Sequence, residues 1–238
     1  MNGTADNIIQ RTRSYLTHQR DLYGSELILN RPGILEDITK TGHGNDLDAF
    51  RASIQVCEKC SLSRSRRHFV FGEGNPKARL MLVGEAPGRE EDLQGEPFVG
   101  QAGHLLDKIL AAIGFRREEV FIGNVLKCRP PQNRDPLPDE IVSCLPYLQE
   151  QISIIQPKII LTLGRIASQT LLKTTAPMSG LRGKTHEFRG IPLMATYHPA
   201  ALLRNPGWKK SVWEDVQKLR KLYDERVGDK PAWQPPQK

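Results

Sequence analysis

The fold of this chain is decided by the stretch Leu80-Met81-Leu82-Val83-Gly84-Glu85-Ala86-Pro87-Gly88. Four apolar residues in a row, ended by glycine, are typical of a strand that is buried on both faces. Two further runs have the same character, at 120–122 and at 159–163. Segments with apolar residues at helical spacing lie between and after these runs, at 102–113, 138–152 and 209–226. This alternation predicts an α/β fold, a three-layer sandwich around a central, mainly parallel sheet.

The predicted domain occupies residues 48–227, and the length is sufficient for one domain with a hydrophobic core. Residues 1–47 form a polar leader with weak helical spacing in one part, so we expect it to be partly helical or disordered. Residues 228–238 contain three prolines and few apolar groups, which predicts a disordered tail.

The charge balance favours a polyanionic partner. Lys and Arg number 34 against 27 Asp and Glu, which gives a net charge of +7 and is typical of proteins that bind nucleic acid. The sequence has no apolar run of membrane length and no secretory leader. We therefore expect a monomer that makes no membrane contact and is cytoplasmic, or associated with the nucleoid in a prokaryote.

Polar residues follow the predicted strands, and ligands of open α/β sheets bind beyond the carboxyl ends of the strands. Three segments stand there: 84–100, 123–128 and 194–206. Each candidate side chain in them also has an ordinary structural interpretation. Phe98 is equally well a core aromatic, Asn124 a turn residue and His198 a loop cap.

Taken together, these three segments resemble the motifs of the family-4 uracil-DNA glycosylases, the iron-sulfur branch of the uracil-DNA glycosylase superfamily. The resemblance covers about residues 50–225 and leaves the leader outside. It implies a DNA repair enzyme that flips uracil out of single- or double-stranded DNA and hydrolyses its N-glycosidic bond, leaving an abasic site. The alternative is a non-catalytic, metal-containing DNA-binding module of the same fold.

Uracil excision assigns a role to each of the main candidates. Phe98 is expected to stack on the flipped base, and the amide of Asn124 to read uracil O4 and N3–H. His198 is expected to donate a hydrogen bond to uracil O2, where negative charge collects as the base leaves. Glu85 is expected to bind the attacking water or to polarise the surroundings of the sugar.

Three neighbouring residues complete the predicted uracil-binding set. Ala86 stands where the most familiar uracil-DNA glycosylases carry a water-activating Asp, so leaving-group stabilisation has the larger part here. Pro87 belongs to the same loop. Glu91 is expected to crowd uracil C5 and so to exclude the methyl group of thymine. The competing interpretation of the acidic run 90–92 is a solvated surface.

Two parts of the sequence are candidates for contact with DNA. After the His198 turn, a bulky residue fills the gap that a flipped nucleotide leaves, and we name Leu203 and Arg204 for this surface. Which residue intrudes into the DNA stays open. Arg66, in the basic stretch 64–68, is expected to contact phosphates, although a solvated basic loop is nearly as good an interpretation.

The four cysteines are predicted to form one metal site. They are Cys57, Cys60, Cys128 and Cys144, and in a reducing setting they are metal ligands rather than disulfides. Their spacing does not separate a zinc site from a [4Fe-4S] cluster. The resemblance implies a structural [4Fe-4S] cluster, with zinc as the less favoured alternative. The position of Cys128, shortly after Asn124, places this site behind the strand that reads uracil.

Overall fold

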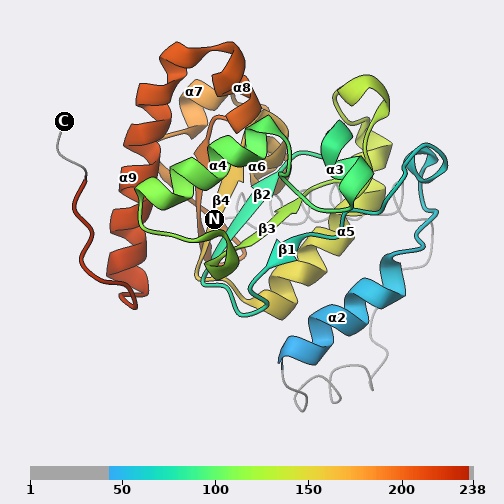
Figure 1. Ribbon diagram of the computed structural model, residues 1–238, viewed down its shortest axis with the longest axis horizontal. Helices are drawn as coiled ribbons and strands as arrows, with labels where there is room; N and C mark the ends of the chain where they lie inside the picture. The colour runs from blue at the N-terminus through green and yellow to red at the C-terminus, as the bar shows by residue number, and fades with distance from the viewer. Residues whose placement is uncertain (1–42, 236–238) are drawn as a thin grey trace, which may run out of the picture. The chain divides into compact units, whose positions relative to one another are not determined.

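The computed structural model describes residues 43–235, so the predicted leader lies outside it as far as residue 42. Its central sheet has six strands in the order β1-β3-β2-β4-β6-β5 (Figure 1). Their bounds are β1 Glu73–Gly74, β2 Leu80–Gly84, β3 Phe121–Asn124, β4 Ile159–Leu163, β5 Thr185–Phe188 and β6 Ile191–Thr196. The four inner strands are parallel, and the two edge strands pair antiparallel. This confirms the predicted mainly parallel sheet.

Helices cover both faces of the sheet. Their bounds are α2 His43–Ile54, α3 Arg89–Gln94, α4 Gln101–Ala112, α5 Pro138–Ile155, α6 Arg165–Leu172, α7 Met178–Leu181, α8 Pro199–Arg204 and α9 Lys209–Arg226. Short 3-10 turns are η1 Ser61–Arg64, η2 Arg117–Glu119, η3 Pro131–Asn133 and η4 Pro206–Trp208. Among the described residues, no helix has both the length and the apolar character that crossing a membrane requires.

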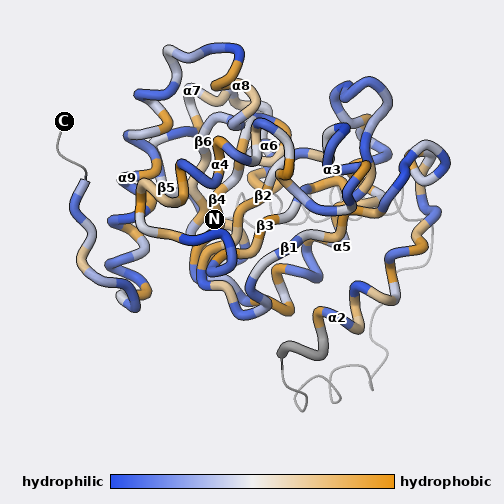
Figure 2. Tube along the Cα trace, in the orientation of Figure 1, coloured by the Kyte–Doolittle hydropathy of each residue, from blue (hydrophilic) through white to orange (hydrophobic). Residues whose placement is uncertain are grey.

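Two hydrophobic cores lie on opposite faces of the sheet, because successive residues of a strand point to opposite sides. Met81 and Val83 of β2 pack into one core with residues of α2, α5 and α6. Leu80 and Leu82 pack into the other with residues of α4, α8 and α9. The buried strands appear as apolar segments in the middle of the trace (Figure 2). The three-layer sandwich is therefore confirmed.

The sheet register brings the strand ends together at one edge. Gly84 at the end of β2 lies opposite Asn124 at the end of β3. The pairing continues past the strands, because the N–H groups of Val125 and Leu126 donate to the carbonyls of Gly84 and Glu85, each at 3.0 Å. The loops that follow β2 and β3 are thus fixed side by side before any ligand binds.

The domain limits differ in detail from those predicted. Helix α2 runs across the expected boundary at residue 48. Residues 228–235 of the expected disordered tail lie against the domain, since Trp233 packs on Trp213 and donates from Nε1 to the carbonyl of Ala112 at 3.1 Å. Lys230 also pairs with Glu119 at 2.9 Å, and Arg220 donates to the carbonyl of Pro231 at 2.6 Å, so contacts with distant residues, which local composition does not predict, hold this segment.

Candidate active site

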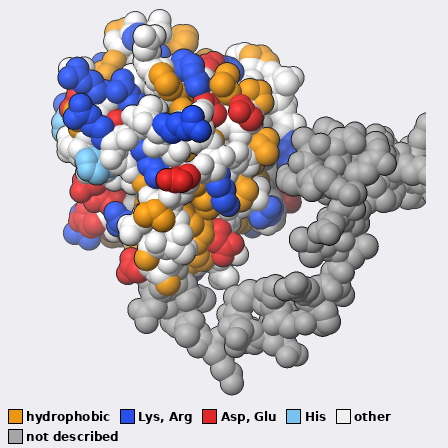
Figure 3. All heavy atoms as spheres, turned by 90° about the vertical axis from the view of Figure 1, so that its right-hand side faces the viewer, with side chains coloured by type: hydrophobic (Ala, Val, Ile, Leu, Met, Phe, Trp, Pro, Cys, Tyr) orange, Lys and Arg blue, Asp and Glu red, His pale blue; other side chains and the backbone are white. Residues whose placement is uncertain are grey.

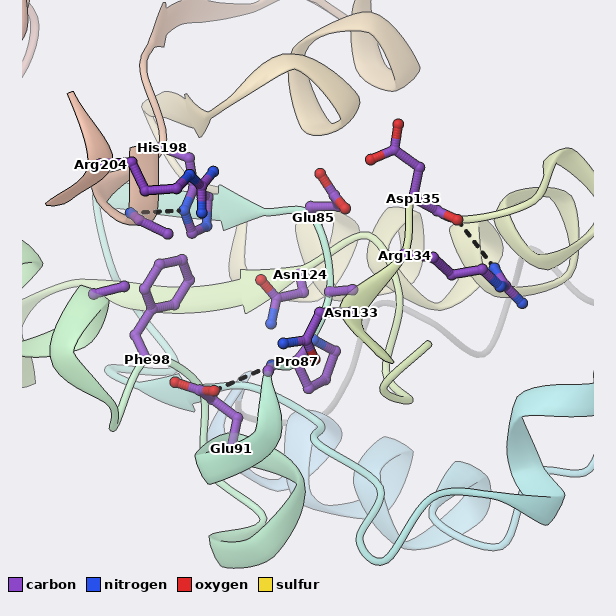
Figure 4. A pocket seen from close by; sticks show the side chains of 14 residues that line it. Glu85, Pro87, Glu91, Phe98, Asn124, Asn133, Arg134, Asp135, His198 and Arg204 are labelled. Atoms are coloured by element: carbon purple, nitrogen blue, oxygen red, sulfur yellow. Dashed lines mark hydrogen bonds between the residues drawn. The ribbon is translucent and has the colours of Figure 1, made fainter. Parts of the chain in front are cut away.

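A cavity of about 320 Å³ opens at the carboxyl edge of the sheet (Figure 4). All the residues predicted to bind uracil line it: Glu85, Ala86, Pro87, Glu91, Phe98, Asn124 and His198. They come from the loop after β2, the end of β3 and the start of α8. The cavity has the position at which ligands bind in open α/β sheets.

Asn124 presents an unused hydrogen-bond acceptor in this cavity. Its side chain is 2% exposed, and its Oδ1 is buried without a partner among the described residues. A Cβ at Gly84 would lie 2.3 Å from that oxygen and 2.8 Å from the ring of Phe98, so glycine is required there. A buried acceptor without a donor costs about 1–3 kcal/mol, and a ligand N–H can recover that cost.

Phe98 is held in a backbone conformation that a non-glycine residue rarely adopts, with φ 54°. Arg117 secures it by donating from Nη1 to the carbonyl of Phe98 at 3.3 Å and from Nη2 to that of Pro97. The guanidinium of Arg117 is itself paired with Asp107 at 3.2 Å and with Glu73 at 3.3 Å. The ring therefore occupies a fixed place in the cavity wall, and Arg117 is a residue that sequence patterns did not reveal.

Glu91 lines the cavity, but its carboxylate is committed to the backbone. Oε1 accepts from the N–H groups of Val99 at 3.0 Å and Gly100 at 3.1 Å, and Oε2 accepts from Gly88 at 3.1 Å (Figure 4). These bonds make Glu91 a clamp between the two ends of the loop that carries Phe98. The clamp is a structural role that the sequence did not suggest, and the exclusion of thymine stays a prediction.

His198 has a defined tautomer. Its Nδ1 accepts from the backbone N–H of Ala200 at 3.1 Å, so in the neutral ring the hydrogen is on Nε2. Burial lowers the pKa of His198 to about 4, and the charge of Arg204 acts in the same direction against the opposing effect of Glu91. Gly164, with φ 92°, makes room for this side chain, because a Cβ there would lie 3.0 Å from the Cβ of His198.

The rings of Phe98 and His198 stack on each other in the lining of the cavity (Figure 4). Their ring centroids are 5.3 Å apart with the planes at 28°. A base inserted between two rings needs about 7 Å, twice the stacking distance of bases in DNA. This arrangement therefore leaves no slot between the rings, and a base must lie beside this pair or displace the imidazole.

Glu85 lies opposite a loop of mixed charge. Burial raises the pKa of Glu85 to about 7, the negative charge of Asp135 adds to the shift, and Arg165 opposes it. Arg165 and Asp135 form an ion pair with each other. Around neutral pH, Glu85 is thus able both to hold and to release a proton.

The loop between β3 and α5 supplies cavity residues that the sequence did not identify. Asn133, Arg134 and Asp135 line the rim. Arg134 forms a two-pronged ion pair with the fully buried Glu140, at 2.9 and 2.6 Å. The prolines at 130, 131 and 136 that flank this loop, so soon after Cys128, are the signal that points to it.

The four cysteines line a second cavity, adjacent to the end of β3 in the chain. Polar hydrogens already surround their sulfur atoms. Tyr147 donates to Cys57 Sγ at 3.1 Å, and the backbone N–H of Lys127 donates to Cys144 Sγ at 3.2 Å. Burial raises the pKa of Cys144 to about 12. Within residues 43–235, no three His, Cys, Asp or Glu side chains converge as a ready-made site for a metal ion.

Arg66 lines this cavity, although its neighbours in the basic stretch 64–68 are exposed. Its Nη1 donates to Cys128 Sγ at 3.3 Å and to the carbonyl of Cys57 at 2.6 Å, and its guanidinium lies over the ring of Phe69. The predicted contact with DNA phosphates stays a prediction, because Arg66 is only partly buried and the printed bonds use Nη1 alone. The guanidinium turns toward Cys128, which lies far from Arg66 in the chain, so the local sequence around Arg66 does not predict this contact.

The segment after His198 divides between core and surface. Leu202 is buried, Leu203 is 45% exposed, and Arg204 lines the cavity. Leu203 and Arg204 therefore stay candidates for contact with DNA, whereas the side chain of Leu202 belongs to the core.

Comparison with known proteins decides the family. The model of the uracil DNA glycosylase superfamily matches residues 71–219. The type-4 uracil-DNA glycosylase of Archaeoglobus fulgidus is 45% identical over 184 residues, which are 74% of this chain and 92% of that protein. The chain belongs to the type-4 uracil-DNA glycosylases.

Two further relatives have the same type-4 name. The uracil-DNA glycosylase of Sulfurisphaera tokodaii is 46% identical over 75% of this chain and 85% of its own length. That of Saccharolobus solfataricus is 45% identical over 74% and 86%. The family inferred from the three motifs is therefore confirmed, and the cavity at the sheet edge is the candidate active site of this uracil-DNA glycosylase.

Proposed function

We propose that this protein flips uracil out of DNA into the cavity at the sheet edge and releases it mainly by stabilising the departing uracil anion. The observation that carries the proposal is the buried, unpaired Oδ1 of Asn124. The N3–H of uracil can donate to this acceptor while its O4 accepts from the same amide, an edge that cytosine lacks and that thymine shares apart from its C5 methyl group. Family membership supports the activity, and the cavity supports the assignment of residues.

His198 serves as the hydrogen-bond donor to uracil O2 in this proposal. Because its Nδ1 is occupied by the N–H of Ala200, the donor is Nε2–H. A pKa of about 4 keeps the ring neutral at physiological pH, so it stabilises the leaving anion as a dipole rather than as a cation. The imidazole turns out of its stack with Phe98 to make this bond, which frees the phenyl ring to stack on the base.

Glu85 binds the attacking water near the sugar. Its ionised form accepts hydrogen bonds from water and favours positive charge that develops on the sugar as the base leaves. No lysine lines the cavity within residues 43–235. The nearby Lys127 is fully buried and donates from Nζ to the carbonyl of Asn124 and to Gln151, at 2.9 and 2.6 Å. Hydrolysis without a covalent lysine intermediate follows from this arrangement.

The cysteine cavity fits a structural [4Fe-4S] cluster, which we propose as the resident cofactor, with zinc as the alternative. Four thiols line one cavity, and the donors from Arg66, Tyr147 and Lys127 suit thiolate sulfur. When bound, the cluster supplies metal–thiolate bonds that join η1, the end of β3 and α5. Brown protein with absorption near ~400 nm, and iron and sulfide on analysis, is expected. Colourless protein that contains one zinc points to the alternative.

In this proposal the DNA binds to the surface around the mouth of the cavity. Arg204 at the rim is placed to contact a phosphate, and the exposed Leu203 to fill the gap left by the flipped nucleotide. Lys and Arg side chains gather at the upper left of the face in Figure 3. Together with the net charge of +7, they favour the sequence-independent attraction to phosphates on which such enzymes depend.

Single-turnover excision tests the proposal. The wild-type protein should release uracil from single- and double-stranded oligonucleotides and leave thymine and cytosine in place. His198→Ala should slow the chemical step about 100-fold, with little change in the affinity for DNA. If affinity falls and the chemical step is unchanged, His198 positions DNA instead. If the wild-type protein binds uracil-containing DNA but releases no base, it is a non-catalytic DNA-binding module.

A further inference from the structure

Exposed hydrophobic side chains draw attention to the turn between α8 and α9. Five large ones in residues 43–235 are at least 40% exposed: Val56, Leu137, Val142, Leu203 and Trp208. Two of them, Leu203 and Trp208, lie on this one turn, and Trp208 is the aromatic member of the set. Because Leu203 and Trp208 are close together in the chain, we consider them as one candidate binding surface.

The indole of Trp208 is held in place on one face. It stacks on the ring of Tyr197 with centroids 4.4 Å apart and planes at 22°. The guanidinium of Arg182 lies 5.6 Å from the centre of the Tyr197 ring, and Asp215, which is 1% exposed, fixes Arg182 by two hydrogen bonds of 3.0 and 2.9 Å. Trp208 is therefore a preorganised aromatic surface rather than a loose side chain.

The charge around this surface fits a polyanion. Arg204, Lys209 and Lys210 are exposed, and the sequence 203–210 contains no acidic residue. Aromatic rings beside exposed cations are the composition of surfaces that bind single-stranded nucleic acid, where bases stack and the cations contact phosphates.

The position of Trp208 relates it to the candidate active site. Tyr197, on which it stacks, directly precedes His198, and Arg204 at the other end of α8 lines the same cavity. Helix α8 has six residues, which corresponds to about 9 Å. The indole is thus within a few nucleotide spacings of the place where the flipped uracil enters.

We propose that Trp208 stacks an unpaired base of the DNA strand that flanks the flipped uracil, with Lys209 and Lys210 on the adjacent phosphates. The proposal rests on DNA being the substrate. An unpaired base is available in single strands and not inside an intact duplex, so the contact favours single-stranded substrate over duplex. Trp208 acts in binding and takes no part in bond cleavage.

Intrinsic fluorescence tests the contact directly. The chain has three tryptophans, and replacing the other two (Trp213→Phe, Trp233→Phe) leaves Trp208 as the single reporter. A uracil-free single-stranded oligonucleotide of about 12 nucleotides should quench its emission as the oligonucleotide binds, and the matched duplex should quench it less. Binding followed by anisotropy without any change in emission would overturn the proposal. Because the oligonucleotide lacks uracil, the result is independent of excision.

Affinity measurements on the otherwise wild-type protein complete the test. Trp208→Ala should weaken single-stranded binding about 10-fold and duplex binding much less, whereas Trp208→Phe should keep most of the affinity because it retains an aromatic face. Val56→Ala, which removes a still more exposed apolar group just after the end of α2, is the control and should bind as the wild type. Equal losses for single strands and duplex would contradict base stacking and indicate a general effect on the His198 segment.

Discussion

In the candidate active site the Oδ1 of Asn124 is buried without a partner among the described residues, whereas in the cysteine cavity Arg66, Tyr147 and the backbone N–H of Lys127 already donate to sulfur. The two regions are close in the sequence, because Asn124 ends β3 and Cys128 follows it after three residues. The difference matches the proposed contents of the two cavities, a flipped base in one and a resident cofactor in the other. A site for a transient guest keeps its acceptor free, and a site for a permanent group surrounds that group with fixed donors.

A buried lysine connects the two regions. Lys127 donates from its backbone N–H to Cys144 Sγ and from Nζ to the carbonyl of Asn124. The amide of Gln151 holds the same Nζ and donates to the carbonyl of Phe71 at 2.8 Å. The end of β3, which we propose reads the base, is therefore fixed from behind by the elements that carry the cysteines, and damage to one region is expected to reach the other.

The largest effect is expected from a substitution in the cysteine cavity. Cys128→Ser removes one ligand of the proposed cluster, and because metal binding is coupled to folding, we expect the Tm to fall by about 10 °C or more and colour and activity to be lost together. Scanning calorimetry and absorption spectra measure this. Ser143→Ala is the control, since it lines the same cavity without a thiol. Retained colour and stability in the cysteine variant would show that Cys128 is not a ligand.

The next largest effect is expected from a substitution of Asn124, whose Oδ1 is the unpaired acceptor among the described residues. Asn124→Asp replaces the amide NH₂ by an oxygen, which mispairs with uracil O4 but accepts from cytosine N4. We expect uracil excision to fall more than about 10-fold and weak cytosine excision to appear, best in single strands where flipping costs least. Release of each base from matched oligonucleotides measures it. Wild-type excision of uracil with none of cytosine would mean that Asn124 does not read the base.

The pH dependence of uracil excision tests the role of Glu85. With a pKa of about 7, raised by burial and then by Asp135, Glu85 is protonated below that pH and ionised above it. If the ionised form holds the water, excision rises about 10-fold from about pH 6 to about pH 8, and Glu85→Gln flattens this rise. Asp135→Asn should move the rise to lower pH, because it removes the neighbouring negative charge. An unchanged profile in both variants would exclude Glu85 from the ionisation.

The smallest effect is expected at the support of Phe98. Arg117→Lys keeps the charge but cannot reach the carbonyls of both Pro97 and Phe98. We expect a rise of a few-fold in KM for uracil-containing DNA and a smaller change in kcat, since the ring is mispositioned rather than lost. Steady-state kinetics separate the two constants. Arg116→Lys, at an exposed neighbour paired with Glu118, is the control and should leave both constants unchanged.

Much of the fold was readable from the sequence because its signals are local. The apolar runs at 80–83 and 159–163 became β2 and β4, and the helical spacing at 209–226 became α9 with the same bounds. The edge strands β1 and β5 were not predicted. Strand β1 has only two residues, both exposed, and only Phe188 of the four residues of β5 is buried. Short, half-exposed strands lack the apolar run that identifies a buried one.

The sequence by itself determined the family, the sheet and the main residues that line the candidate active site, because these depend on strand ends and on motifs of adjacent residues. Only the tertiary structure decided that Arg66 turns to the cysteines, that Glu91 and Arg117 hold the Phe98 loop, and that Trp208 lies open beside the cavity. The physical reason is that partners far apart in the chain settle these roles. A charged side chain goes where its desolvation is compensated, and no local pattern records that place.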